Sequence, residues 1–219
     1  MQETTAYSKT EKSITLFLLC WFIINCLQAA FTELHPDEAY YWVYSRFLDW
    51  GYFDHPPMIA IFIKAGYTFF QNEFGLRLLV VIATTCSLYI TWLIAKSYKI
   101  AAATFLIVIA PLFLLHIYGF VATPDAPLLL FATLFYYYFR KYQEHDNLRA
   151  ALVLGIITAG LFYSKYHGIL LIGFTVLSDF TLLKRRSFWI ACFIAILLFI
   201  PHLYWQYTHD FPSIKYHLI

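Results

Sequence analysis

Long uncharged apolar runs follow one another along most of this 219-residue chain. A membrane-spanning helix needs about 20 mostly apolar residues. Hydrophobic residues make up 61% of the chain and charged residues only 13%, whereas a soluble domain has about 25% charged residues. The sequence therefore predicts an integral membrane protein. The net charge of +2, without a large basic patch, argues against a nucleic-acid partner.

The apolar runs predict an all-α, polytopic fold with about seven membrane-spanning helices. The first run is longer than the core of a signal peptide and lacks a small-x-small cleavage site, so we expect a retained signal anchor. Residues 37–70 mix acids, aromatics and prolines, which predicts a long outer loop carrying interfacial helices. The predicted spans are residues 14–31, 74–95, 100–117, 126–139, 150–163, 169–183 and 188–205.

Loop charges predict how these helices are oriented. With a cytoplasmic N-terminus, most basic residues fall in inner loops, and the cluster at residues 184–186 is the strongest anchor. Most acidic residues then fall on the outer face, among them Asp37, Glu38, Asp54 and Asp125. Acids contribute little to orientation, so their accumulation on one face is a functional signal.

The first polar motif, His35-Pro36-Asp37-Glu38, follows the first predicted span. Proline suits the first position of a helix, and acids suit its first turn, so helix capping would explain the motif without any function. Neighbouring residues of a helix point about 100° apart. We therefore expect Asp37 and Glu38 to do different work, one facing a cavity and the other holding the loop.

The second motif runs from Gly51 to Pro57 and contains the pair Asp54-His55 before two prolines. The prolines predict a rigid, extended turn, which could be an ordinary surface turn at the membrane interface. The functional alternative places Asp54 and His55 at the rim of a pocket that binds a sugar or a metal. An Asp-His pair is a weak metal signal, since metal sites normally use three or four ligands.

The third motif, Thr123-Pro124-Asp125, starts the fourth predicted span on the outer side. Thr123 and Pro124 suit a helix start. A charge inside the membrane boundary is costly, and a neutral Asn or Ser would cap the helix equally well. We therefore favour a functional role for Asp125.

The fourth motif, residues 164–168, lies between the fifth and sixth predicted spans and contains Lys165 and His167. A lysine on the outer face runs against the charge bias, so Lys165 needs a partner. A phosphate is one candidate and an acid such as Asp125 is another. The structural alternative is a lysine whose stem covers apolar surface while its amine reaches water.

Together these motifs resemble those of glycosyltransferase family 39. That family includes the dolichyl-phosphate-mannose–protein mannosyltransferases and the transferases that decorate lipid A. The resemblance covers about residues 33–218. It is carried by His35 to Trp42, Gly51-Tyr52 with Asp54-His55-Pro56-Pro57, Thr123 to Leu128, Ser164 to Gly168, and Trp205 with His209-Asp210.

The resemblance implies a GT-C fold in the inner membrane, with a seven-span module and interfacial helices in the outer first loop. It also implies inverting transfer of a sugar from a polyprenyl-phosphate donor to lipid A, another glycan or a protein. Asp37 matches the expected general base, and Glu38 its substitute or assistant. Family members are usually near twice this length, so residues 1–219 are expected to form a single, N-terminal module of a longer enzyme.

The chemistry of such a transfer suggests roles for the outer residues. Asp37 would take the proton of the attacking hydroxyl, a contribution of about 10²–10⁴-fold. Lys165, helped by His167, would stabilise the charge of the leaving phosphate. Asp125 would orient Lys165 or bind the acceptor. The lipid tail would lie among membrane lipids, with its head group near Trp42 and Trp50.

No cofactor is required by this chemistry, although Glu38, Asp54 and His55 could share a divalent metal ion. Two other classes of protein fit parts of the pattern. A transporter or flippase for a lipid-linked sugar should have inverted repeats and charges near the membrane midplane, and the sequence shows neither. The other class is a non-catalytic membrane scaffold, such as a truncated family member, and Asp37→Asn would then cost no function.

Overall fold

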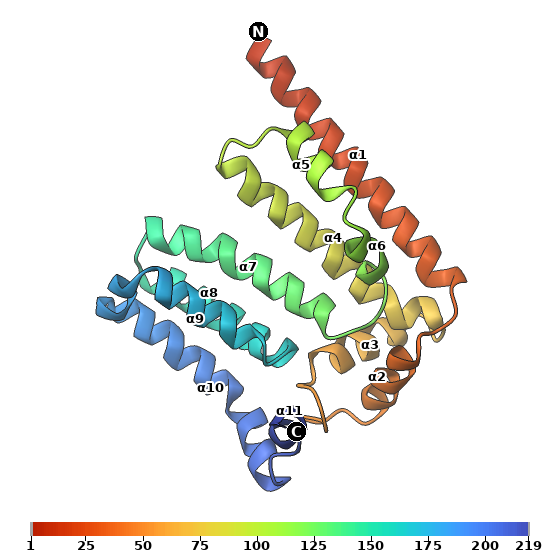
Figure 1. Ribbon diagram of the computed structural model, residues 1–219, viewed down its shortest axis with the longest axis vertical. Coiled ribbons are helices and arrows are strands. Elements are labelled where there is room, and N and C mark those ends of the chain that lie inside the picture. Colours follow the sequence, from red (N-terminus) through yellow and green to blue (C-terminus); the bar gives the residue numbers. More distant parts are fainter. Residues whose placement is uncertain (1, 219) are drawn as a thin grey trace.

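The computed structural model describes residues 2–218, and all regular structure within them is helical (Figure 1). The prediction of an all-α fold is therefore confirmed for these residues. The elements are α1 (Gln2–Phe31), α2 (Pro36–Arg46), α3 (Met58–Phe69), α4 (Glu73–Ser97), α5 (Ala102–Ile109), α6 (Phe113–Tyr118), α7 (Asp125–Glu144), α8 (Leu148–Ser164), α9 (Gly168–Ser178), the 3-10 helix η1 (Phe180–Lys184), α10 (Arg186–Thr208) and α11 (Pro212–Leu218).

Three of the described helices are long and apolar enough to cross a membrane: Glu11–Phe31 within α1, α4 and α10. A helix that is apolar all round is typical of a membrane span. Large apolar side chains also remain exposed on α1 and α10, among them Leu16, Leu19, Leu27, Phe193 and Ile196. Exposed apolar surface of this kind marks contact with lipid or protein, so the chain is a membrane protein.

The other predicted spans correspond to shorter or interrupted helices. The span predicted at residues 100–117 is divided into α5 and α6 around Pro111, because proline lacks the N–H that continues a helix. The span predicted at 169–183 ends at Ser178, where the Asp179 side chain caps η1 by accepting from the Thr181 N–H at 3.0 Å. The count of seven spans therefore stays a prediction.

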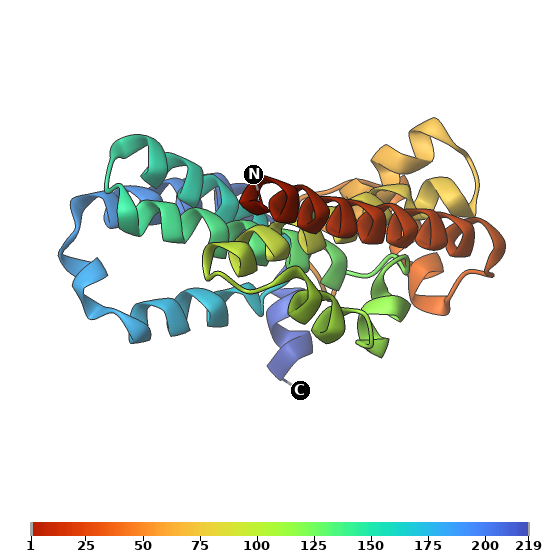
Figure 2. The same cartoon turned by 90° about the horizontal axis from the view of Figure 1, so that it is seen from above.

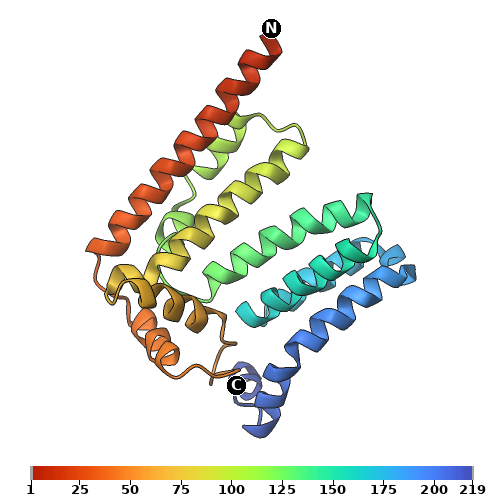
Figure 3. The ribbon, with the colours of Figure 1, turned by 180° about the vertical axis from the view of Figure 1, so that it is seen from behind.

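The long helices pack in two groups that meet along α4 and α7 (Figures 1 and 3). In one group α4 packs against α1, and in the other α8 packs against both α7 and α10. A Cβ atom at Gly155 would lie 2.7 Å from the Ala191 carbonyl oxygen, so a side chain there would separate α8 from α10. Seen from above, the two groups lie at opposite ends of an elongated assembly (Figure 2).

The end of the molecule away from the N-terminus holds α2, α3 and α11 (Figure 1). A buried apolar cluster fixes this end to the long helices: Tyr41 of α2, Ile59 and Ile63 of α3, and Leu76 and Val80 of α4. Residues 37–70 thus contain two helices, α2 and α3, joined by the Asp54 loop. Their position at a membrane interface stays a prediction.

Candidate active site

A capping box starts α2 just beyond the end of α1. The N–H of Asp37 donates to His35 Nδ1 at 3.3 Å, and the N–H of His35 donates to Glu38 Oε2 at 2.9 Å. Pro36 lies in the first turn, where its missing N–H leaves no partner unsatisfied. Capping is therefore present, and it positions two adjacent carboxylates in different surroundings.

Glu38 is fully buried and forms an ion pair with Arg77 of α4. Arg77 donates from Nε to Glu38 Oε1 at 2.7 Å and from Nη2 to Oε2 at 2.6 Å, and the Ala122 N–H donates to Oε1 at 2.8 Å. Burial by itself would raise the pKa of Glu38, but the hydrogen bonds from Arg77, Ala122 and His35 outweigh it and lower the pKa. The carboxylate therefore stays charged at neutral pH, with both oxygens occupied.

Arg77 also holds the end of α1. Its Nη1 donates to the carbonyl oxygens of Ala29 at 3.1 Å and Thr32 at 2.8 Å, and its Nη2 donates to the carbonyl oxygen of Glu33 at 2.8 Å. The last carbonyls of a helix have no partner inside the helix, so the guanidinium supplies one. A single side chain thus joins α1, α2 and α4, and through Glu38 it reaches the segment before α7.

Asp37, in contrast, is open to solvent, with 63% of its side chain exposed and Oδ2 3.6 Å from His35 Nδ1. No other cation among the described residues lies within ion-pair distance of it. A general base must reach the proton that it removes. Asp37 is accessible from solvent, whereas Glu38 is enclosed by its partners.

Asp54 lies in the loop before α3 and is buried. Its Oδ1 accepts hydrogen bonds from the hydroxyls of Tyr44 at 2.9 Å and Tyr40 at 3.2 Å, and these two hydroxyls also contact each other. Burial raises the pKa of Tyr44, and the neighbouring Asp54 charge raises it further. The tyrosines therefore remain donors that hold the carboxylate toward α2.

His55 is packed between two rings, with centroids 5.8 Å from Tyr41 and 6.0 Å from His217. Its Nε2 lies 3.9 Å from Asp54 Oδ2, and its buried Nδ1 has no hydrogen-bond partner among the described residues. Burial lowers the pKa of His55, although the Asp54 charge opposes the shift. His55 is thus a neutral imidazole at neutral pH, and its unpaired Nδ1 is enclosed by the surrounding side chains.

Asp125, at the start of α7, pairs with Lys165, which follows α8. The Lys165 Nζ donates to Asp125 Oδ1 at 2.8 Å. The side chains are 22% exposed for Lys165 and 47% exposed for Asp125. Of the two partners considered for this lysine, the structure therefore shows the acid, in a pair that remains accessible to solvent.

Tyr41 reveals that the motifs converge. Burial raises the pKa of the Tyr41 hydroxyl, and the charges of Asp54, Asp37 and Asp125 raise it further. These carboxylates come from the first turn of α2, the loop before α3 and the start of α7, so the charges of three motifs act on one side chain. The charge of Lys165 likewise acts on His55.

His167 occupies a more peripheral place. It is exposed at the N-terminus of α9, and its ring centroid lies 6.4 Å from that of His217 in α11. His217 in turn lies with Nε2 3.1 Å from the Asp54 carbonyl oxygen. The link between His167 and the other polar residues therefore passes through α11.

A buried polar network around α10 was not predicted. His202 Nδ1 contacts the Trp50 carbonyl oxygen at 2.6 Å, and its Nε2 contacts the Tyr166 hydroxyl at 2.9 Å. Gln206 donates to that hydroxyl at 2.9 Å and to Ser213 Oγ at 2.6 Å. Burial raises the pKa of Tyr166 to about 12, so this network positions the surrounding loops through neutral groups.

Two signals in the sequence could have identified the missed residues. Arg77 is the only charged residue in the apolar run 74–95, and a charge inside such a run needs a partner. His202, in the run 188–205, and Gln206, just after it, are polar residues four positions apart, a spacing that puts both on one helix face. Neither signal identifies the residues that these side chains contact, because Glu38, Trp50 and Tyr166 lie far away in the sequence.

The donors considered for a shared metal ion do not fit one. Both Glu38 oxygens are occupied by Arg77 and backbone N–H groups. Among the described residues, no group of three or more His, Cys, Asp and Glu side chains is arranged to hold a metal. We therefore derive no step through a metal.

The sequence profile of the dolichyl-phosphate-mannose-protein mannosyltransferase family matches residues 54–205. The chain belongs to this family. The match confirms the resemblance seen in the motifs, and with the apolar helices it identifies a membrane protein of a glycosyltransferase family. The matched region contains Asp54, His55, Asp125, Lys165 and His167, whereas Asp37 and Glu38 precede it.

The chain is also similar to the lipid A galacturonosyltransferase RgtD of Rhizobium johnstonii. The two sequences are 24% identical over 215 residues, covering 93% of this chain and 44% of the relative. The chain thus spans less than half the length of that relative. No solved structure matches.

Proposed function

We propose that this chain forms the sugar-transfer module of an enzyme that uses a polyprenyl-phosphate sugar as donor. The observation that carries the proposal is that the charges of Asp37, Asp54 and Asp125 all act on Tyr41, whose ring centroid lies 5.8 Å from that of His55, while Lys165 pairs with Asp125. A transferase with an anionic leaving group needs a base and a cation in one site. This cluster offers both.

In the proposed reaction an acceptor hydroxyl attacks the anomeric carbon of the donor with inversion. The new glycosidic C–O bond forms as the bond from that carbon to the phosphate oxygen breaks. Asp37 receives the hydroxyl proton, and the electron pair leaves with the lipid phosphate. Lys165, assisted by His167, stabilises that phosphate. Asp125 holds the Lys165 ammonium in place until the phosphate binds it.

Glu38 acts in this proposal as a positioning residue. Its bonds to Arg77 and Ala122 fix the first turn of α2 to α4 and to the segment before α7. The orientation of Asp37 follows from that attachment, since both carboxylates belong to the same helical turn. Asp54 and His55 would contact the donor or the acceptor from the facing loop.

We infer that the module crosses the inner membrane several times, with the N-terminus in the cytoplasm and the site on the periplasmic face. The loop-charge bias supports this orientation. Three of the predicted spans coincide with described helices long and apolar enough to cross a membrane, and the other four contain helical segments, which is compatible with the seven-span GT-C arrangement, with α2 and α3 at the interface. The described residues would then be one module of a longer enzyme.

A lipid acceptor of the lipid A type is favoured, because the curated relative is named for lipid A. Mass spectrometry of envelope lipids, glycans and glycoproteins would test this in cells that lack the gene and carry wild type, Asp37→Asn or Glu33→Gln at matched expression. Glu33 is a nearby exposed acid outside the cluster. We expect one sugar mass to return on lipid A with wild type and Glu33→Gln but not with Asp37→Asn.

Other outcomes would change the proposal in defined ways. A sugar mass on a glycan or protein would replace the acceptor and leave the chemistry intact. Restoration by Asp37→Asn would remove Asp37 as the base. A wild-type chain that restores nothing would point to a non-catalytic scaffold, and accumulation of the lipid-linked sugar on the wrong membrane face would point to a transporter.

A further inference from the structure

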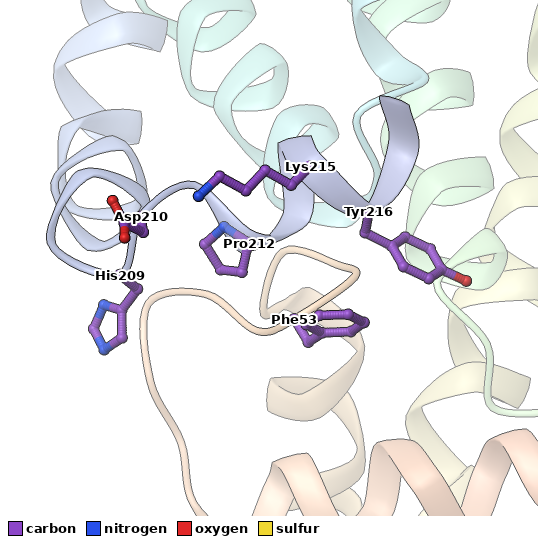
Figure 4. A pocket seen from close by; sticks show the side chains of 6 residues that line it. All are labelled: Phe53, His209, Asp210, Pro212, Lys215 and Tyr216. Carbon is purple, nitrogen blue, oxygen red and sulfur yellow. The ribbon is translucent and has the colours of Figure 1, made fainter. Parts of the chain in front are cut away.

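A cavity lined by aromatic and charged side chains lies beside the Asp54 loop (Figure 4). It has a volume of about 560 Å³, within the range of small-molecule sites. None of the side chains around it has a part in the reaction proposed above. They come from the loop before α3 and from the segment between α10 and α11: Phe53, His209, Asp210, Pro212, Lys215 and Tyr216.

We propose that this cavity binds the sugar head group of the acceptor, a phosphorylated saccharide. The inference rests on the proposed function, since it names where that enzyme holds its second substrate. Three properties of the cavity support it: exposed aromatic rings, charges without internal partners, and walls fixed to the Asp54 loop.

The aromatic rings are Phe53 and Tyr216. They are 58% and 49% exposed, and their centroids lie 5.3 Å apart in an edge-on arrangement. The face of an aromatic ring is electron-rich and attracts the polarised C–H groups on one side of a sugar ring. Two large rings left open in a cavity that also carries charged groups therefore suit a saccharide better than a lipid tail.

The charges are Asp210 and Lys215. No ion pair joins them to each other or to another side chain in the part of the chain that the structure describes. A carboxylate accepts hydrogen bonds from sugar hydroxyls, whereas an ammonium donates to hydroxyls or phosphate. His209 adds an imidazole held by stacking on Trp205, with ring centroids 4.3 Å apart. A ligand with both hydroxyl and phosphate groups uses all of these donors and acceptors.

The backbone of this segment is held in an uncommon conformation. Asp210 has φ 64° and Phe211 has φ 55°, a region that residues other than glycine rarely occupy. The Phe211 N–H donates to the Gln206 carbonyl oxygen at 2.7 Å, and Ser213 Oγ donates to the Tyr52 carbonyl oxygen at 2.6 Å. These bonds fix the turn and join it to the loop that carries Phe53.

The cavity also adjoins the proposed catalytic cluster. Tyr216 precedes His217, whose Nε2 lies 3.1 Å from the Asp54 carbonyl oxygen. Phe53 precedes Asp54 itself. A head group held between Phe53 and Tyr216 would therefore lie next to the loop that faces α2, from which a hydroxyl can be presented to Asp37.

Isothermal titration calorimetry on the full chain in nanodiscs would test this. The probe is the soluble, fully deacylated head group of lipid A, a phosphorylated glucosamine disaccharide, which does not partition into the bilayer. We expect Lys215→Met to weaken binding about tenfold, because a charge-assisted hydrogen bond is lost. Tyr216→Leu should weaken binding roughly fivefold through the lost ring face. With the dephosphorylated disaccharide, Lys215→Met should bind like wild type.

The matched controls are Lys64→Met and Tyr204→Leu, exposed residues outside the cavity, which should leave binding unchanged. Wild-type binding that neither cavity variant weakens would overturn the assignment, as would a wild type that binds neither disaccharide. Binding measured this way requires no transfer. A chain that binds the probe through Lys215 and Tyr216 but moves no sugar would keep the cavity and lose the proposed function. A chain that moves sugar to lipid A without binding the probe would keep the function and lose the cavity.

Discussion

Two ion pairs with similar N–O distances lie in opposite surroundings in this molecule. Glu38 and Arg77 meet at 2.6 Å with side chains 0% and 1% exposed, whereas Asp125 and Lys165 meet at 2.8 Å in a partly open site. A buried pair cannot exchange its partner for water, so it holds helices together. An open pair can lose its partner to a ligand, so it suits binding. Burial, more than the identity of the groups, separates the two roles.

Breaking the buried pair should have the largest effect. Arg77→Met leaves a buried carboxylate without a cation and should lower the free energy of unfolding by about 3–5 kcal/mol. Thermal unfolding in detergent, followed by circular dichroism, measures the loss. The double variant Arg77→Met/Glu38→Met should recover the part of the loss that comes from the unpaired buried charge, but not the part that comes from the α1 carbonyls and the Ala122 N–H, which lose their partners. Equal losses in the single and double variants would show that the charge itself is not the cause.

Breaking the open pair should separate activity from stability. Lys165→Met should lower the transfer rate by about 10²–10³-fold, through lost stabilisation of the leaving phosphate. It should change the free energy of unfolding by only about 0–1 kcal/mol, as is usual for an exposed pair. Steady-state rates and melting curves on the same preparation measure both, with Lys64→Met as control. A melting temperature as low as that of Arg77→Met would mean that this pair is structural as well.

Asp54 lies between these extremes, since it is buried but meets hydroxyls and not a cation. Tyr44→Phe removes one of its two tyrosine donors and leaves Tyr40. We expect a loss of about 0.5–1.5 kcal/mol in the free energy of unfolding, the usual worth of one hydrogen bond. Chemical denaturation would measure it. A loss as large as that from breaking the buried ion pair would show that Asp54 depends on Tyr44 alone.

The pH dependence of stability should be the smallest effect near neutrality. The pKa of Glu38 is lowered in the folded chain, so its contribution to stability is complete above its unfolded pKa of about 4.3. That contribution is lost as the pH falls from there through the folded pKa. Above about pH 5, Glu38 should therefore not change the melting temperature, and below that pH the melting temperature should fall. Glu38→Gln should flatten the acid limb, and an unchanged limb would exclude Glu38 as its source.

The sequence located polar motifs near the ends of helices. Asp125 could be named in advance as one of two candidate partners of Lys165, because the predicted spans and the loop charges put both on one face. Glu38 and Arg77 could not be paired in advance, because their contact joins α2 to α4 across a long separation in sequence. The span boundaries at residues 111 and 179 also differed, because a hydropathy run does not show where a proline or an aspartate divides a helix.

The sequence by itself determined the class of protein, its helical content, its family and the start of α2, since these depend on composition and on local backbone chemistry. The prediction of Thr123 as the cap of α7 was wrong, because Pro124 lies at the N-cap and no described side chain caps this helix. Tertiary structure decided which carboxylate became enclosed and which stayed open. Asp37 and Glu38 are chemically near-identical neighbours, and both could serve as a base when viewed in isolation. Only the approach of α4 buries Glu38 on Arg77, because desolvation and hydrogen bonding act across the fold and not along the chain.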